Sequence, residues 1–143
     1  MKKLVVGAGA YQRAASIHVR YQVFVLEGSI PKEEEFDQND HEDTIYAVMY
    51  EGENPVSTAR FLPLNNQEAR ITRVATCKKQ RGLGYAGEVV TALEDYAVQH
   101  GIHRLIIHSE LAAKSFYESI GYQAYGEVYM EDGVPCQSLE KIK

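Results

Sequence analysis

The fold of this 143-residue chain is decided by the stretch Arg70-Ile-Thr-Arg-Val-Ala-Thr-Cys-Lys-Lys-Gln-Arg-Gly-Leu-Gly-Tyr-Ala-Gly87. Its first part, residues 70–76, predicts a β-strand because β-branched and small residues occur there without glycine or proline. Two glycines, Gly82 and Gly84, follow a short basic cluster, and apolar residues then recur with helical spacing. The stretch therefore predicts a strand, a glycine turn and a helix, in that order.

The predicted helix has apolar or aromatic residues every three to four positions, and Gly101 stands where a helix-ending glycine is expected. A helix N-terminus directs unpaired backbone N–H groups and the positive end of its dipole at an anion. Glycines in the preceding turn allow the backbone to approach that anion closely. We therefore expect the turn to bind the diphosphate of a cofactor. The helical positions are Leu83, Ala86, Val89, Val90, Leu93, Tyr96, Ala97 and His100.

Two known patterns fit this turn. Gly82-Leu-Gly84-Tyr-Ala-Gly87 has the G-x-G-x-x-G spacing of a dinucleotide-binding loop, which requires a parallel βαβ unit and an acidic residue about 20 positions later. Arg81-x-x-Gly84-x-Ala86 instead resembles the Q/R-x-x-G-x-G/A turn of the GCN5-related N-acetyltransferases, the GNAT superfamily. In that superfamily the turn holds the pyrophosphate of acetyl-CoA.

The N-terminus also begins like a dinucleotide-binding unit. Residues 4–12 contain a strand-like run and two glycines, but Gln12 stands where the pattern requires its third glycine. We therefore favour a short strand over residues 3–6 and a helix over residues 10–25, and keep the dinucleotide-binding domain as an alternative. The residues expected on the buried face of this helix are Ala14, Ile17, Tyr21 and Phe24.

The segment before the glycine turn favours the acetyl-CoA pattern. Thr44–Tyr50 and Val56–Leu64 predict strands on either side of a short turn, and a second turn leads into residues 70–76. Strands joined by short turns are antiparallel, whereas a dinucleotide-binding domain needs helical crossovers. After the long helix, residues 103–108 predict a buried strand that runs parallel to residues 70–76.

Two further segments resemble the GNAT superfamily. Leu111–Gly121 predicts a helix and is similar to the element A-x-x-x-Y-e-x-x-G-F/Y, with Ala113, Tyr117 and Gly121 in register. Near the N-terminus, Arg20-x-x-Val-Phe-Val-x-Glu27 and then Glu35-x-Asp-x-x-Asp40 are similar to the signature of the small bacterial YjcF-like and ElaA-like acetyltransferases. The C-terminal residues 122–130 and 135–142 predict the two strands of a hairpin.

The resemblance implies a single GNAT acetyltransferase domain over residues 1–143 with an α/β (α+β) fold. Its central sheet is mixed and mostly antiparallel, with helices on both faces and a splayed parallel strand pair at the cofactor site. The two strands of that pair are expected to part after residue 76, and the pantetheine arm of acetyl-CoA would lie between them. The residues expected to contact acetyl-CoA (CoA) are Val74, Ala75, Thr76, Arg81, Gly82, Leu83, Gly84, Tyr85, Ala86 and Tyr117.

Tyr117 is the residue that we expect to act as the general acid. A thiolate leaving group has a conjugate acid pKa of about 8.5 and a phenol one of about 10, so a phenolic O–H can protonate the departing sulfur. The helix pattern alone favours a core tyrosine at position 117; the motif register favours the catalytic role.

The general base is less clearly marked. Candidates are Glu27, Asp37, Asp40, His108 and Glu110, and we select His108 and Glu110 because they end the strand beside the expected site. Two positions depart from the family pattern. Glu110 stands where many members carry asparagine, and Cys136 replaces a histidine of the related small enzymes, so the roles of those residues do not transfer.

Composition limits the partners. A net charge of −5 argues against nucleic acid, no apolar run approaches the roughly 20 residues of a membrane span, and the cysteines form no metal-binding pattern. We therefore expect a cytoplasmic protein without a metal. Residues 33–43 carry seven acidic side chains, which predict either a solvated loop or a negative lip that attracts a cationic amine.

The resemblance implies an N-acetyltransferase that moves an acetyl group from acetyl-CoA to a small-molecule or peptide amine by direct attack in a ternary complex. Backbone N–H groups of residues 74–76 would polarise the thioester carbonyl. The alternatives are a non-catalytic acyl-CoA-binding or sensing module on the same fold and a protein that binds a dinucleotide such as NAD. A homodimer is compatible with the resemblance, because C-terminal strand exchange occurs within this fold.

Overall fold

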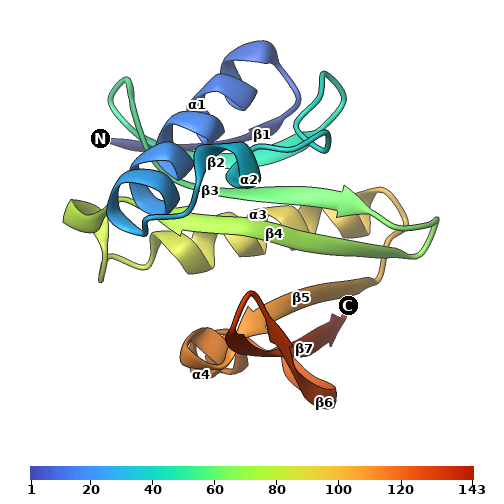
Figure 1. The fold of residues 1–143 in the computed structure, drawn as a ribbon. Coiled ribbons are helices and arrows are strands. Elements are labelled where there is room, and N and C mark those ends of the chain that lie inside the picture. The colour runs from blue at the N-terminus through green and yellow to red at the C-terminus, as the bar shows by residue number, and fades with distance from the viewer.

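Seven strands form one sheet in the computed structural model, which describes residues 1–143 (Figure 1). Their order across the sheet is β1-β2-β3-β4-β5-β7-β6, and every neighbouring pair is antiparallel except β4 and β5. The predicted mixed and mostly antiparallel sheet is therefore confirmed. The strands are β1 (Lys2–Gly7), β2 (Ile45–Glu51), β3 (Asn54–Pro63), β4 (Glu68–Thr76), β5 (Arg104–Glu110), β6 (Gln123–Glu131) and β7 (Val134–Ile142).

Helices cover both faces of this sheet. Helix α3 packs on one face of β1 to β4, α1 packs on the other, and α4 packs on the β5–β7 half (Figure 1). No helix is at once long enough and apolar enough to cross a membrane. The helices are α1 (Ala10–Arg20), the π-helix η1 (Tyr21–Glu27), α2 (Lys32–Glu35), the 3-10 turn η2 (Lys78–Gln80), α3 (Tyr85–Gln99) and α4 (Leu111–Ser119).

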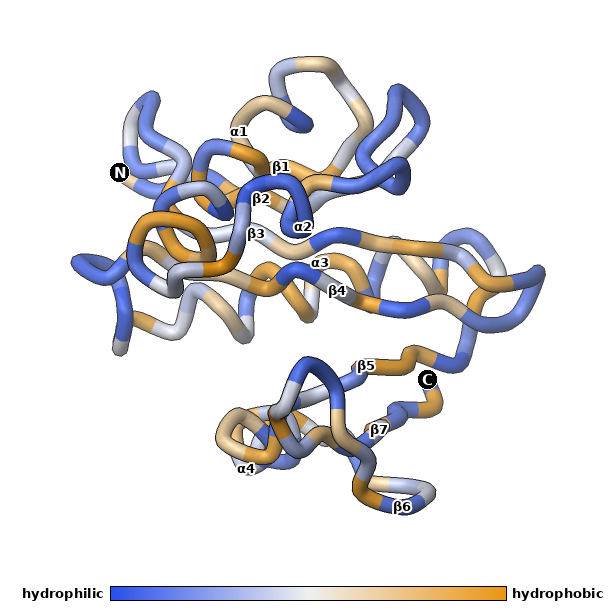
Figure 2. The backbone as a smooth tube through the Cα atoms, viewed as in Figure 1, coloured by the Kyte–Doolittle hydropathy of each residue, from blue (hydrophilic) through white to orange (hydrophobic).

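Side-chain alternation along β2 separates the two layers. Ala47 and Met49 belong to the main apolar core under α3, whereas Tyr46 and Val48 face α1. Helix α3 contributes a fully buried stripe that includes Val89, and its C-terminus is closed by the left-handed Gly101. Figure 2 shows hydrophobic residues concentrated in the strands and α3, with hydrophilic residues in the connecting loops.

The buried face of α1 differs from the prediction. Gln12, Ala15, Ser16, Val19 and Arg20 are buried there. The predicted face was wrong because much of the true face is polar and therefore has no apolar periodicity. Its polar groups are buried only because they have partners: the Gln12 side chain donates to Val5 O at 2.9 Å, and Ser16 accepts from the hydroxyl of Thr58 at 2.8 Å. Of the residues expected there, Ala14 and Tyr21 are exposed, and Ile17 and Phe24 are half-buried.

Strands β4 and β5 separate early. They are parallel, as predicted, but they pair only where Glu68, Ala69 and Arg70 face Arg104, Leu105 and Ile106. The strands therefore part after Arg70 rather than after residue 76. Beyond that point β5 continues to pair with β7 on its other side. Figure 1 shows the β5–β7–β6 unit turned away from β4, so the later half of β4 has no strand on its β5 side.

Candidate active site

The glycine turn presents a row of unoccupied backbone donors. None of the six amides from Gly82 to Gly87 donates to a protein acceptor, and α3 begins at Tyr85 within this row. Gly82 and Gly84 have φ angles of 83° and 84°, and a Cβ on either would meet no atom within 4 Å. The glycines are therefore required by the left-handed backbone and leave open space in front of the amides. A phosphate group fits this arrangement of donors.

A cavity of about 450 Å³ lies against the turn. It brings together six of the residues predicted for the cofactor: Thr76, Arg81, Gly82, Gly84, Tyr85 and Ala86. Leu83 does not line it and is 55% exposed, and Val74, Ala75 and Tyr117 lie outside its lining. Gln80, Gly87 and Phe116 line the cavity but were not predicted as site residues, although the first two flank the turn motif in sequence.

The Arg81 side chain is already paired. Both of its terminal nitrogens lie 2.7 Å from the carboxylate oxygens of Glu27, and its Nε donates to Thr76 O at 3.0 Å. Hydrogen bonds from Arg81 lower the pKa of Glu27. Arg81 thus lines the first cavity, but its charge is paired with Glu27 at the end of η1.

A second cavity, of about 630 Å³, adjoins the same basic cluster. Lys78 and Lys79 line it together with Cys77 and Glu27, and Gln80 is shared with the first cavity. The Cys77 thiol is hydrogen-bonded to Gln22 at 3.2 Å, and burial raises its pKa. The Cys77 thiol is therefore protonated at neutral pH.

Strand β4 contains a bulge between its paired part and the glycine turn. Thr58 faces Ala75, whereas Arg60 faces Thr72, so Arg73 and Val74 together lie opposite a single residue of β3. Arg73 takes a left-handed conformation with φ 53°, which is unfavourable for a residue with a side chain. The bulge interrupts the β3–β4 ladder at Val74, in the part of β4 that has no pairing with β5.

The carbonyl groups after the bulge have protein donors. The hydroxyl of Ser57 lies 3.2 Å from Ala75 O and 2.8 Å from the hydroxyl of Thr76, while Thr76 O accepts from Arg81. These contacts fix the end of β4.

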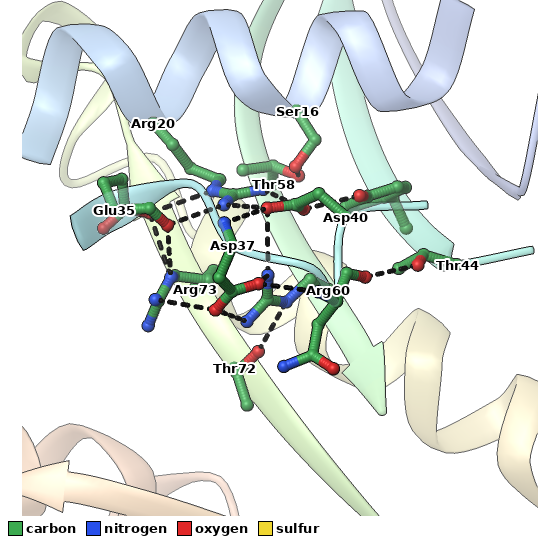
Figure 3. A network of polar contacts seen from close by, with 12 residues as sticks. Ser16, Arg20, Glu35, Asp37, Asp40, Thr44, Thr58, Arg60, Thr72 and Arg73 are labelled. Atoms are coloured by element: carbon green, nitrogen blue, oxygen red, sulfur yellow. Dashed lines mark hydrogen bonds and ion pairs between the residues drawn. The ribbon is translucent and has the colours of Figure 1, made fainter. Parts of the chain in front are cut away.

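A network of three arginines and three acids holds the bulge from the α1 side (Figure 3). Arg20 donates to Glu35 and Asp40, Arg60 to Asp37 and Asp40, and Arg73 to Glu35 and Asp37, at N···O distances between 2.8 and 3.3 Å for the ion pairs. Arg20 and Arg60 are 0% and 2% exposed. The acids come from the segment after η1, so the network joins α1, that segment, β3 and β4.

The network accounts for three of the seven acids of residues 33–43, because Glu35, Asp37 and Asp40 are neutralised by arginines and cannot form a negative lip. The other four lie outside the network and are exposed, as the solvated-loop interpretation predicts: Glu33, Glu34, Glu42 and Asp43. Burial would raise the pKa of Asp40, but hydrogen bonds from Arg20 and Tyr46 outweigh it and hold that pKa well below its usual range. At Glu35 burial prevails and raises the pKa, despite the Arg73 and Arg20 charges.

Tyr117 projects from α4 into the core with a free hydroxyl. The ring is 8% exposed and packs edge-on against Phe116 at 5.0 Å and Tyr122 at 6.1 Å. Burial alone raises the pKa of Tyr117 to about 12. The neighbouring Tyr122 differs, because its hydroxyl donates to the buried Glu94 at 2.8 Å. Tyr117 therefore holds an uncommitted proton beside the first cavity, which Phe116 lines.

His108 and Glu110 lie on the same face of β5, both exposed. The His108 ring is 6.2 Å from that of Tyr129, and Glu110 lies where α4 begins. Partial burial and the nearby Arg70 lower the pKa of His108, against an opposing effect of Glu131. The other candidate bases are engaged: Glu27 with Arg81, and Asp37 and Asp40 with the network. No group of three or more histidine, cysteine and acidic side chains is placed to hold a metal ion.

Comparison with known proteins agrees with this geometry. A sequence profile of the Acetyltransferase (GNAT) family matches residues 12–122. The chain is 50% identical over 108 residues to an uncharacterised acetyltransferase of Streptococcus pyogenes, covering 76% of this chain and 74% of that protein. It is 31% identical over 140 residues to the uncharacterised N-acetyltransferase YjcF of Bacillus subtilis strain 168, covering 97% of this chain and 99% of that one.

Solved structures agree as well. The crystal structure of a candidate N-acetyltransferase from Lactobacillus plantarum superimposes with a TM-score of 0.94 and 37% identity, covering 99% of this chain and 97% of that chain. Escherichia coli ElaA shares the fold with a TM-score of 0.84 and 23% identity, covering 99% of each chain. The chain therefore belongs to the GNAT family of acetyltransferases.

Proposed function

We propose that this chain, as one domain over residues 1–143, transfers an acetyl group from acetyl-CoA to the amine of an acceptor bound at the same time. The observation that carries the proposal is the parallel pair β4 and β5, which parts after Arg70 beside six backbone amides without protein acceptors. The open strand edge matches the amide-containing pantetheine arm of the cofactor, and the row of free N–H donors matches its diphosphate.

Binding would be divided between these two features. The amides of Gly82 to Gly87 donate to the diphosphate, with support from the α3 dipole and the open cavity. The edge of β4 from Ile71 to Thr76 lacks a β5 partner, and the pantetheine arm binds there in place of the missing strand. Acetyl-CoA supplies the activated acetyl group, and the bulge at Val74 aims a backbone N–H at its carbonyl.

Two side chains would move the protons. His108, whose pKa is lowered, accepts a proton from the acceptor ammonium, and the free amine nitrogen forms the new bond to the acetyl carbon. The carbon–sulfur bond breaks, the Tyr117 hydroxyl donates its proton to the sulfur, and the extra proton on the new amide nitrogen returns to the Tyr117 phenolate through solvent. Tyr117 suits this role because its proton is uncommitted and its pKa, raised to about 12, keeps it protonated at neutral pH.

The experiment combines binding and turnover. Thermal unfolding with acetyl-CoA, CoA, NAD and NADP should show stabilisation by the first two alone, and thiol release should require both acetyl-CoA and an amine. Stabilisation by NAD or NADP and not by acetyl-CoA would contradict the proposal. Binding of acetyl-CoA without turnover across polyamines, amino acids, aminoglycosides and peptides would favour the acyl-CoA-binding module instead.

A further inference from the structure

Two buried side-chain atoms, Arg70 Nε and Tyr129 Oη, have no hydrogen-bond partner. An unpaired buried donor is costly, so native proteins retain few of them. The Ser138 side chain lies close enough to act on the Tyr129 hydroxyl as a weak hydrogen-bond donor outside normal geometry, which leaves the proton of Tyr129 without an acceptor. Both orphan groups can donate a hydrogen bond, which points to a missing acceptor.

The two orphans flank the site on one face of the sheet. Arg70 is the last residue of β4 that pairs with β5, directly before the strands part. It shares its face with Thr72, which bonds to Arg60, while the intervening Ile71 faces the α3 core. On β5, Ile107 faces the same core, so His108 lies on the Arg70 face. Tyr129 reaches this face from β6, with its ring 6.2 Å from His108.

Arg70 also differs from other strand arginines in its charge balance. Arg60, Arg73 and Arg104 each form ion pairs with acidic side chains, whereas Arg70 has no carboxylate oxygen within 4.0 Å. The exposed Glu131 acts on Arg70 only from a longer distance. The face beside His108 therefore holds one uncompensated guanidinium, with its Nε withdrawn from solvent.

We propose that Arg70 and Tyr129 bind a carboxylate of the acceptor, so that the acceptor is an amino acid in the broad sense, a small molecule with both an amine and a carboxylate. This inference rests on the proposed function. A carboxylate accepts hydrogen bonds on both oxygens, and a guanidinium and a phenol are both donors. With the carboxylate held between β4 and β6, the amine is directed to His108 and to the opening between β4 and β5.

The test uses amines matched in size with and without a carboxylate: glycine and glycinamide, β-alanine and its amide, and 4-aminobutyrate and its amide. The wild-type enzyme should prefer the acid member of at least one pair, and that pair reports the spacing between amine and carboxylate. Arg70→Gln and Tyr129→Phe should each lower kcat/KM for the acid by about 10- to 100-fold and leave the amide nearly unchanged, because a charged hydrogen bond is lost. Arg13→Gln, on α1 and outside the site, is the matched arginine control.

Binding gives a second readout that does not require turnover. Isothermal titration of the CoA complex with N-acetylated forms of the same acids and amides should show the same preference, and Arg70→Gln should abolish it. Equal affinity for acid and amide, or equal losses on both in Arg70→Gln, would overturn the inference. Acetyl-CoA should still stabilise Arg70→Gln thermally. If the wild type itself showed neither that stabilisation nor thiol release, the proposed function would fail, and the inference with it.

Discussion

Tyr117 and Tyr122 show how one hydrogen bond decides what a buried tyrosine can do. Their rings are 6.1 Å apart and both are buried in the same core. Tyr122 donates to Glu94, a fully buried carboxylate that also pairs with Lys141 at 2.9 Å. Tyr117 has no such partner, and only burial acts on its pKa. Tyr122 is fixed in the core by its hydrogen bond, whereas the Tyr117 hydroxyl keeps a free proton, as its proposed role as general acid requires.

Replacement of Tyr117 by Phe should lower kcat by about 100-fold or more and leave the KM for acetyl-CoA nearly unchanged, because only the proton donor is removed. Since burial raises the pKa of Tyr117 to about 12, the wild-type rate should not fall between pH 8 and pH 10 through loss of this proton. Steady-state kinetics across that range measure both effects. Tyr122→Phe is the control: it should reduce the free energy of unfolding. A Tyr117→Phe enzyme with full kcat would remove the general-acid role.

His108 should titrate below the ordinary histidine value of about 6.5. Its pKa is lowered by partial burial and by Arg70, while Glu131 opposes them. A base works only when deprotonated, so kcat/KM should decline on the acid side of that lowered pKa. NMR titration should place the pKa of His108 below 6.5 and show it rising in Arg70→Gln. An unchanged acid limb in His108→Gln, with His103→Gln as control, would exclude His108 as the base.

At the scale of elements, the sequence predicted strands and helices more successfully than their packing. The strands and the helices α3 and α4 are marked in the sequence by regularly spaced apolar residues or by turn residues at their ends. Their positions agree with the prediction to within a few residues. The buried face of α1 could not be predicted from apolar spacing, because three of its residues are polar: Gln12, Ser16 and Arg20. Their partners, such as Asp40 and Thr58, lie far away in sequence.

Asp40→Asn should destabilise the protein by about 3 kcal/mol or more, because it removes one partner from buried Arg20 and Arg60. The wild-type pKa of Asp40 lies below its unfolded value of about 3.9. Its stabilising contribution is therefore complete above about pH 5 and is lost as pH falls through the folded pKa. Urea unfolding at pH 7 measures the first, and a series from pH 5 down to pH 2 measures the second. Asp43→Asn, which is exposed, should change little; an equal loss in the two variants would contradict the stabilising role of the network.

Alanine substitutions at two glycines can separate an effect on acetyl-CoA binding from an effect of backbone strain. Gly84 and Gly52 both have positive φ and open space where a methyl group would lie, but Gly52, in the β2–β3 turn, does not line the cavity. Alanine at either position should cost about 1 kcal/mol of stability through the left-handed backbone. Alanine at position 84 alone should also raise the Kd for acetyl-CoA, because its methyl group occupies space in front of the amides. Equal Kd values for both variants would argue against binding at the turn.

At the scale of the whole molecule, the candidate site lies where the sheet leaves the later half of β4 without a neighbouring strand on its β5 side. The sequence predicted the parallel β4–β5 pair from the helical crossover between two strands, and that much is confirmed. It could not predict where the strands part, because residues 70–76 contain no glycine or proline that would mark a break at Arg70. Net charge was equally uninformative about residues 33–43, since ion pairs with Arg20, Arg60 and Arg73 form only in the folded chain.

The central claim is that the amides of Gly82 to Gly87 and the open edge of β4 receive a phosphorylated thioester carrier. Amide NMR of this 16.1 kDa chain during titration with CoA tests it most directly. We expect the resonances of residues 82–87 and 74–76 to shift together and their hydrogen exchange to slow, with β1 and β2 unaffected. If these amides kept their positions and exchange rates at saturating CoA, or responded to NAD instead, the claim would be contradicted.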